Sequence, residues 1–169
     1  RRRVCIFRKT RTEIHRGMNL SDTSTPQALA QAASQAMWAR DNATHALGME
    51  LVSVNPGRAV LRMKVRADMV NGHHICHGGL IFTLADSAFA YACNSYNLNT
   101  VASGCSIDFL APGREGDVLE ATAVERSAAG RTGVYDVEVK VVGGNTVALF
   151  RGKSYRIKGE VIAGLEGHN

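Results

Sequence analysis

One carboxylate stands alone in the most apolar segment of the sequence. Residues 80–93 read Leu-Ile-Phe-Thr-Leu-Ala-Asp-Ser-Ala-Phe-Ala-Tyr-Ala-Cys, and Asp86 is the single charge among them. An unpaired carboxylate in apolar surroundings loses hydration, and this loss raises its pKa, as is common at catalytic sites. In the alternative, structural role, Asp86 pairs with a basic residue of another element or bonds backbone groups. The segment makes Asp86 the leading candidate for a catalytic carboxylate.

The residues just before this segment form a second candidate group. The run from Asn71 to Gly79 reads Asn-Gly-His-His-Ile-Cys-His-Gly-Gly. Adjacent glycines at a helix start let a ligand approach the backbone, and the first amides of a helix point outward at the positive end of its dipole. Gly78 and Gly79 therefore suit an oxyanion hole for a carbonyl oxygen that gains charge, with a plain tight turn as the alternative. We expect His77 to cap or orient the helix start.

Four residues of this run are also of types that bind zinc. His73, His74, Cys76 and His77 lie within five consecutive positions, and no partner pair follows at a usual spacing. Structural zinc sites usually draw their ligands from two separated pairs. We therefore predict no metal site.

The elements that position these residues follow from the periodicity of the chain. Thr25-Pro26 suits a helix start, and residues 27–40 carry apolar side chains at helical spacing. Residues 78–95 predict one long apolar helix. Six segments are predicted as strands: 49–54, 58–65, 100–110, 118–126, 133–142 and 146–157. Hairpin-length turns make the sheet mainly antiparallel, so the expected fold class is α+β.

The spacing of Gly78 and Asp86 requires more than one chain. Eight residues separate them, which is about 12 Å along a helix. An oxyanion donor and a catalytic carboxylate must both lie near one reacting carbonyl. A helix that is apolar nearly all round also needs cover on every side. We therefore expect two antiparallel copies of this helix, crossing near Phe82 and Thr83, to form two composite sites in a homodimer.

Length and composition place the chain among globular proteins. It has 169 residues, of which 45% are hydrophobic and 21% charged, and this suits one compact domain. No run approaches the ~20 apolar residues of a membrane-spanning helix, so we expect no membrane partner. The cysteines form no Cys-x-x-Cys pair, which favours reduced thiols in the cytoplasm. They are Cys5, Cys76, Cys93 and Cys105.

The net charge of +5 comes from one end of the chain. Residues 1–20 hold seven basic side chains and one acid, a sum of +6, so the other 149 residues sum to −1. An arginine-rich arm can bind nucleic acid or act as a transit peptide. We instead expect residues 1–25 to be a disordered extension, native or added by cloning, and expect no nucleic-acid partner. The predicted domain covers residues 26–158, and residues 159–169 form a C-terminal tail.

Residues 71–94, which contain both candidate groups, resemble the signature of PaaI-type hotdog-fold acyl-CoA thioesterases. Residues 101–113, 130–136 and 146–155 are similar to further parts of that family, and the likeness extends over roughly residues 28–157. The resemblance implies a hotdog fold, in which an antiparallel sheet wraps a long helix, and a dimer that often pairs into a tetramer. It also implies hydrolysis of aryl- or arylacetyl-CoA thioesters, as in phenylacetate breakdown.

The same resemblance implies roles for individual residues. By position, Asp86 matches the catalytic carboxylate of the family, Gly78 its oxyanion glycine and Asn71 its site asparagine, and Ser103 lies where relatives place a hydroxyl. The chemistry fits, because a thiol with a pKa near 8.5 leaves as thiolate without a strong acid. Asp86 would act as a base toward water or as a nucleophile, and both routes stay open. No cofactor is expected, since CoA is part of the substrate.

Further residues are candidates for holding the substrate. Arg114 and Arg131 lie in turns with glycine neighbours such as Gly130 and suit the phosphates of CoA, although each is equally a solvated surface arginine. The other candidates for the substrate pocket are His77, Gly79, Phe82, Phe89 and Tyr91, of which the aromatic residues also suit a buried core.

Two other functions are compatible with the sequence. A hotdog hydratase or dehydratase would need a histidine and an acid for proton transfer at the α and β carbons, and His77 is available. A non-catalytic acyl-CoA-binding protein needs no central carboxylate, so Asp86 argues against it. Release of free CoA from thioesters, rather than turnover of enoyl-CoA, distinguishes a thioesterase from both.

Overall fold

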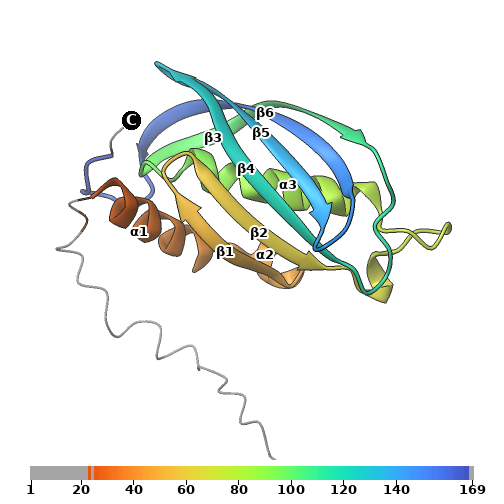
Figure 1. Cartoon of the computed structure of the whole chain (residues 1–169). Coiled ribbons are helices and arrows are strands. Elements are labelled where there is room, and N and C mark those ends of the chain that lie inside the picture. Colours follow the sequence, from red (N-terminus) through yellow and green to blue (C-terminus); the bar gives the residue numbers. More distant parts are fainter. Residues whose placement is uncertain (1–22, 24, 168–169) are drawn as a thin grey trace, which may run out of the picture.

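The structure, a computed structural model, describes residue 23 and residues 25–167 (Figure 1). Helix α1 (Pro26–Trp38) begins where the Thr25 hydroxyl accepts a 3.1 Å hydrogen bond from the amide of Ala28, so the predicted helix start is confirmed. Helix α2 (Asn42–Ala46) follows, with the Asp41 carboxylate as its cap. Nearly all of the expected basic extension lies outside the described residues.

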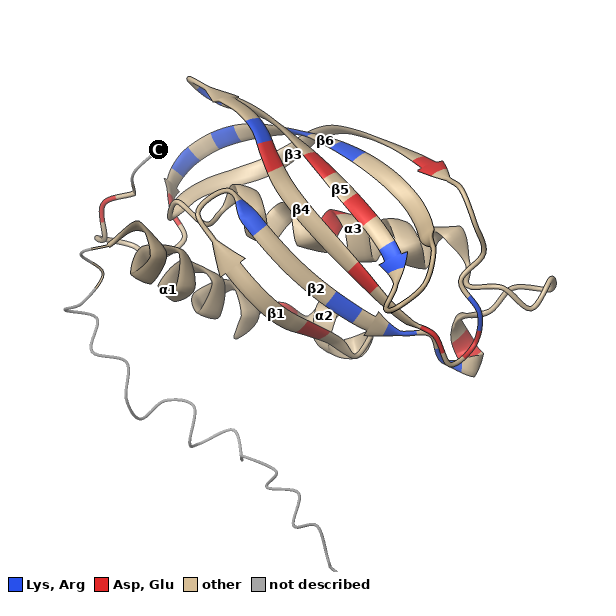
Figure 2. Ribbon diagram, in the orientation of Figure 1, with Lys and Arg blue, Asp and Glu red and all other residues tan. Residues whose placement is uncertain are grey.

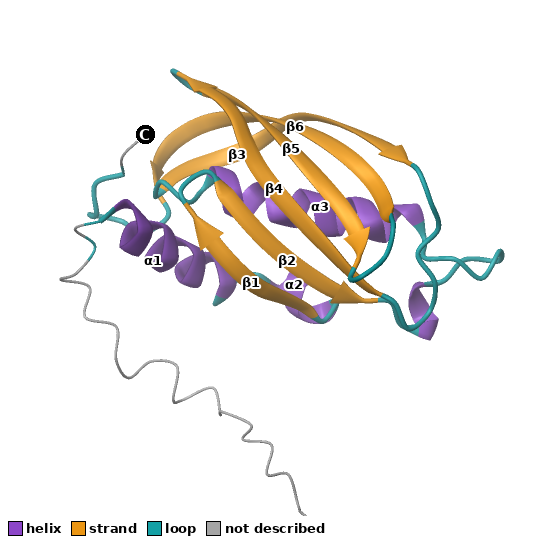
Figure 3. Ribbon diagram, viewed as in Figure 1, coloured by secondary structure: helices purple, strands orange, loops and turns teal. Residues whose placement is uncertain are grey.

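Six antiparallel strands form one sheet that curves around helix α3 (Gly78–Cys93), as Figures 1 and 3 show. The strand order is β1-β2-β4-β5-β6-β3. A short 3-10 turn, η2 (Ala67–Met69), leads toward α3. The strands are β1 (Met49–Asn55), β2 (Arg58–Lys64), β3 (Leu98–Phe109), β4 (Val118–Ala129), β5 (Thr132–Val141) and β6 (Thr146–Glu160). The predicted α+β arrangement of a long helix wrapped by six strands is therefore confirmed.

Small residues let the sheet approach α3 closely. Ala85, Ala88 and Ala92 of the helix are completely buried. A Cβ atom at Gly152 of β6 would lie 2.9 Å from the ring of Phe89, a distance that side chains do not tolerate. The close contact between helix and sheet therefore requires glycine at this position.

Charged residues recur along the strands of the sheet (Figure 2), and their alternation with buried apolar residues places their side chains on the outer face, away from α3. In β5 the buried Val137 and Val139 alternate with Asp136 and Glu138 on this outer face, as the period of two predicts. Neighbouring strands supply partners for these charges. The ion pairs join Glu120 to Arg62 and Lys140, and Asp136 to Arg126 and Arg151.

The sheet covers only part of α3. Residues that recur at helical spacing remain partly or fully exposed in the single chain, and we call this surface the open stripe. Beside it runs β3, an edge strand without a strand neighbour on its outer side among the described residues, whereas α1 packs against the opposite edge strand, β1. The open stripe consists of Gly79, Phe82, Thr83, Asp86, Ser87 and Ala90.

The segment that follows the last strand packs against the rest of the domain. β6 continues to Glu160, and the buried Asn97 accepts a 2.8 Å hydrogen bond from the amide of Ile162. The division into a domain and a tail near residue 158 stays a prediction. No helix in the described part of the chain is long and apolar enough to cross a membrane.

Candidate active site

Asp86 lies in the middle of the open stripe of α3 and is half-buried. Within residues 25–167 its carboxylate has neither a hydrogen-bond partner nor an ion-pair partner. Burial raises the pKa of Asp86 above its ordinary value, and no nearby charge opposes this effect. The pairing that a purely structural role would require is absent from this part of the chain.

A cavity of about 340 Å³ opens beside Asp86. The side chains of Phe89, Ala90 and Cys93, which follow Asp86 on the same face of α3, line one side of it. Residues of β3, of α1 and the turn after it, and of the segment after β6 line the rest, and none of these was among the residues predicted for the site. These are Met37, Arg40 and Val161, together with Asn94 and residues 99–102.

Asn94 fixes the wall that β3 contributes to this cavity. Its side-chain amide donates to the carbonyls of Ala90 and Thr100 at 3.0 and 2.9 Å. Its carbonyl oxygen accepts from the amide of Thr100 at 2.9 Å. The C-terminal end of α3 is thereby tied to the start of β3, which holds the cavity open between them.

The start of α3 leaves one backbone amide available. His77 caps the helix as expected, because its Nδ1 accepts a 3.0 Å hydrogen bond from the amide of Gly79. This bond uses the Gly79 amide and places the proton of neutral His77 on Nε2. The amide of Gly78, in contrast, donates to no atom of the described residues. Of the two glycines considered for the oxyanion hole, Gly78 is therefore the one whose backbone amide can donate a hydrogen bond to a ligand.

Asn71 organises the loop that leads to this helix start. Its Oδ1 accepts hydrogen bonds from the amides of His73 at 2.9 Å and Ile75 at 3.4 Å. His74, between them, has a positive φ of 57°. The side chain thus holds a tight loop together, and its amide nitrogen has no acceptor within the described part of the chain.

The predicted aromatic pocket residues fall into two groups. Phe89 lines the cavity, whereas the ring of Phe82 packs 5.4 Å from that of Phe150 and lies outside the cavity lining. Tyr91 is buried, and its hydroxyl donates a 3.1 Å hydrogen bond to Asp41. Ser103 sits at a bulge of β3, where its hydroxyl donates to the carbonyl of Lys153 at 3.1 Å.

One chain does not bring all predicted site residues together. Gly78 and Asp86 belong to the same helix, eight residues or about 12 Å apart. Arg114 precedes β4, and Arg131 follows it in the hairpin whose Gly130 has a φ of 60°. The 12 residues of β4, whose path is about 40 Å long, place these two exposed arginines near opposite ends of the strand. Among the described residues, no three His, Cys, Asp or Glu side chains lie close enough together to hold a metal ion.

Known proteins share this fold. The sequence model of the thioesterase superfamily matches residues 73–148. The structure of the Escherichia coli PaaI protein superposes with a TM-score of 0.79 at 51% identity, covering 80% of this chain and 99% of that one. A Thermus thermophilus PaaI structure gives a TM-score of 0.67 at 42% identity, covering 69% and 100% of the two chains. The fold is that of a hotdog thioesterase.

The similarity also extends to curated enzymes. The acyl-coenzyme A thioesterase PaaI of Escherichia coli is 54% identical over 128 residues, which are 76% of this chain and 91% of that protein. A Streptococcus mutans structure bound to acetyl-CoA matches with a TM-score of 0.62 at 27% identity, covering 64% and 88% of the two chains. The chain therefore belongs to the thioesterase superfamily and, within it, to the PaaI-type acyl-CoA thioesterases, which hydrolyse thioesters.

Proposed function

We propose that this enzyme hydrolyses aryl- or arylacetyl-CoA to CoA and the free acid at the Asp86 cavity. The observation that carries the proposal is a half-buried carboxylate, without a partner among the described residues, beside a cavity with mainly apolar walls. Met37, Phe89 and Val101 offer apolar surface from three different elements, which suits an aromatic ring. The likeness to the PaaI enzyme of Escherichia coli supports the same substrate class.

The reaction needs a nucleophile, a place for the developing oxyanion and a stable leaving group. Ionised Asp86 either removes a proton from a water molecule that attacks the carbonyl carbon, or attacks that carbon itself. The carbonyl oxygen then carries negative charge, which a Gly78 amide stabilises by donating a hydrogen bond. The carbon–sulfur bond breaks as the carbonyl reforms, and CoA leaves as a thiolate. In the nucleophilic route, water then hydrolyses the acyl-aspartyl anhydride.

The site needs a second copy of the chain. Two open stripes packed antiparallel about a two-fold axis near Thr83 would place Gly78 of the partner subunit beside Asp86. The exposed edge of β3, next to the stripe, offers backbone groups for the same interface. Such a homodimer would form two sites, and pairing of two dimers would give a tetramer.

The same symmetry would unite the two arginines at opposite ends of the sheet. Antiparallel packing brings the Arg114 end of one chain toward the Arg131 end of its partner, where both would contact the phosphates of CoA. His77, Gly79 and Ser103, which lie along the open stripe or β3, would border the pantetheine arm.

The role of Arg131 has a direct test. We expect Arg131→Ala to raise KM for CoA thioesters about fivefold with little change in kcat, because a rim phosphate contact contributes to binding alone. Steady-state kinetics at fixed ionic strength measure this effect, and an unchanged KM would leave Arg131 without a role in the site.

The proposed substrate class is tested with a panel of thioesters. Phenylacetyl-, benzoyl-, octanoyl- and crotonyl-CoA are offered to the full chain, and released thiol is measured. We expect the highest kcat/KM for the aromatic esters and no hydration of crotonyl-CoA. A preference for octanoyl-CoA would contradict the aromatic assignment. Sedimentation under assay conditions should give a dimer or tetramer, and an active monomer would contradict the composite site.

We also propose that the enzyme works in the cytoplasm. Cys76, Cys93 and Cys105 are free thiols, and two of them are buried in the core. Free thiols are usual in reducing compartments. Fractionation of the native host's cells, followed by detection of the protein, tests this proposal.

A further inference from the structure

One cation, Arg40, lies at the wall of the Asp86 cavity. Among the described residues that line the cavity, it is the single basic side chain. It stands just after α1, far from α3 in sequence. Its Nε donates to the carbonyl of Ala36 at 3.0 Å, and its Nη2 donates to the carbonyl of Val161 at 3.3 Å. The guanidinium is thus held at two points instead of extending freely into solvent.

A buried residue sets the second of these points. Asn97 is completely buried and has a positive φ of 62°. Its backbone carbonyl accepts a 3.3 Å hydrogen bond from the amide of Val161, and its side chain bonds both Ile162 and Leu165. The segment after β6 is therefore fixed against the turn between α3 and β3. This anchoring places the Val161 carbonyl where it positions Arg40.

Arg40 also has no counter-ion within residues 25–167. None of the ion pairs in this region includes it, although Asp86 lines the same cavity. The raised pKa of Asp86 has burial as its cause, with no opposing contribution from Arg40, so the two charges do not neutralise each other. Nη1 has no acceptor in the described structure. A permanently charged donor group therefore remains available to a ligand in the cavity.

We propose that Arg40 is a specificity-determining residue that donates a hydrogen bond to an oxygen atom at the far end of the acyl group. The inference rests on the proposed function, in which the thioester carbon lies at Asp86. Apolar surface from Met37, Phe89 and Val101 lines the same cavity and suits an aromatic ring. The favoured acyl group is an aromatic one that carries a hydroxyl or carboxylate remote from the thioester.

The phosphates of CoA are a second source of acceptor oxygens. A long pantetheine arm separates them from the thioester, whereas Arg40 shares one cavity of about 340 Å³ with Asp86. A group that lines the cavity of the proposed catalytic carboxylate is placed to meet the acyl part of the substrate. The acyl oxygen is therefore the assigned partner.

The experiment compares 4-hydroxyphenylacetyl-CoA with phenylacetyl-CoA in the wild-type chain and in Arg40→Leu. We expect the ratio of their kcat/KM values to fall about tenfold or more in the variant, as loss of a charged hydrogen bond predicts. Arg40→Lys should recover part of the ratio. Arg58→Leu removes another exposed arginine, at the start of β2 and outside the cavity lining, and should leave the ratio unchanged.

Two results would overturn the assignment. The first is an unchanged ratio in Arg40→Leu. The second is a change of the ratio in Arg40→Leu that disappears when both esters are made with dephospho-CoA. This result would show that Arg40 contacts the 3′-phosphate of CoA and not the acyl group. If the wild-type chain releases no thiol from either ester, the proposed function fails. Calorimetric binding of the two intact esters to the wild-type chain and Arg40→Leu then tests the contact, and equal relative affinities would reject it.

Discussion

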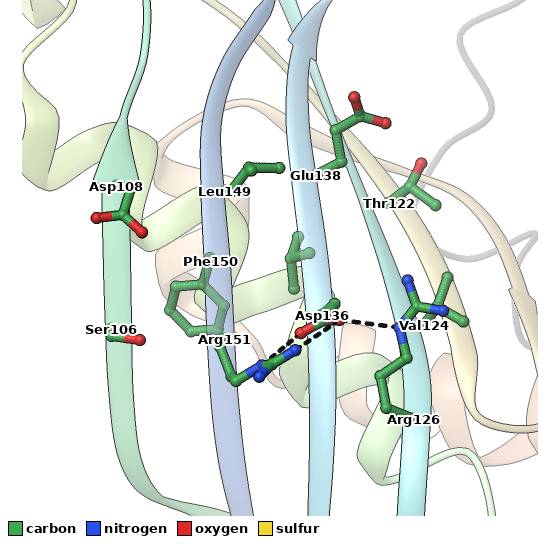
Figure 4. A pocket seen from close by; sticks show the side chains of 11 residues that line it. Ser106, Asp108, Thr122, Val124, Arg126, Asp136, Glu138, Leu149, Phe150 and Arg151 are labelled. Atoms are coloured by element: carbon green, nitrogen blue, oxygen red, sulfur yellow. Dashed lines mark hydrogen bonds and ion pairs between the residues drawn. The ribbon is translucent and has the colours of Figure 1, made fainter.

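Two aspartates of this protein have opposite surroundings. On the outer face of the sheet, Asp136 accepts hydrogen bonds from Arg126 at 2.9 Å and from Arg151 at 2.7 and 3.0 Å (Figure 4). These contacts lower the pKa of Asp136, with the Arg151 hydrogen bond as the largest cause. On the open stripe, Asp86 has no such partner in the described structure, and burial raises its pKa. A carboxylate whose charge is already satisfied holds strands together, whereas an unsatisfied one remains reactive.

The hollows beside the two aspartates show the same difference. The outer face has a hollow of about 550 Å³, larger than the cavity of about 340 Å³ at Asp86. Figure 4 shows that its side chains include Asp136 and the two arginines that neutralise it. The central carboxylate of the larger hollow, Asp136, is therefore already neutralised, and we propose that catalysis takes place at the smaller one.

The largest expected effect is a difference in kcat between variants of the two aspartates. Asp86→Asn should lower kcat about 100-fold or more, because it removes the base or nucleophile. Asp136→Asn, the matched control, should keep kcat within about threefold, since its carboxylate serves the sheet. Steady-state thiol release measures both, with oligomeric state checked by sedimentation. Similar losses in the two variants would remove the distinction.

A smaller effect is expected at the start of α3. A Cβ atom at Gly78 would lie 3.0 Å from the ring of Phe109, so Gly78→Ala must displace that ring or the amide. We expect kcat to fall about tenfold, because oxyanion donors act only in accurate positions. Gly72→Ala places its Cβ in open space and serves as the control. Equal kcat values for the two variants would argue against an oxyanion role for Gly78.

The pH dependence of the reaction offers a finer comparison. Asp86 must be ionised to act, so kcat/KM should fall with acidification, with a midpoint above the ordinary aspartate pKa of about 3.9. Asp136→Asn should leave this midpoint unchanged. Initial rates across a buffer series of constant ionic strength measure it. A midpoint at or below the ordinary value would mean that Asp86 is not the titrating group.

The smallest expected effect concerns thermal stability. At neutral pH, Asp136→Asn should lower Tm by about 2–4 °C, since it removes two surface ion pairs. Asp86→Asn should raise Tm, because its raised pKa means that the folded state disfavours the ionised form. Calorimetry checks both signs.

Acidification sharpens the same measurement. The gain in Tm from Asp86→Asn arises because the wild-type carboxylate is ionised. This gain should vanish below the unfolded pKa of about 3.9, where Asp86 is protonated in both the folded and the unfolded state. The stabilisation by Asp136 is present above that value and is lost as the pH falls through its lowered folded pKa. A decrease of Tm in Asp86→Asn at neutral pH would show that a partner satisfies this carboxylate.

Much of the fold was predictable from local pattern. Thr25 before Pro26 marked the start of α1, and the alternation around Asp136 oriented β5. These features depend on a cap and on a period of two, both of which are set by neighbouring residues. The ends were less certain, since β6 runs on to Glu160, three residues past the predicted end at Ile157.

The site was only partly predictable. The lone charge in an apolar helix identified Asp86, and the glycine pair identified the helix start. Residue types and spacing did not distinguish Gly78 from Gly79, because the choice depends on the direction of the His77 ring, and only the family resemblance assigned the oxyanion role to Gly78. Phe82 and Phe89 were equivalent as aromatic residues of one helix, yet only Phe89 lines the cavity.

The sequence by itself determined that this chain has an isolated carboxylate on a long helix and that the helix start offers backbone donors. Only the tertiary structure decided what surrounds that carboxylate. Arg40, Asp86 and Val161 are distant along the chain and meet because the sheet curves and the segment after β6 folds back to Asn97. Local spacing records neighbours on one helix or strand, whereas the walls of a cavity come from segments that chain folding brings together.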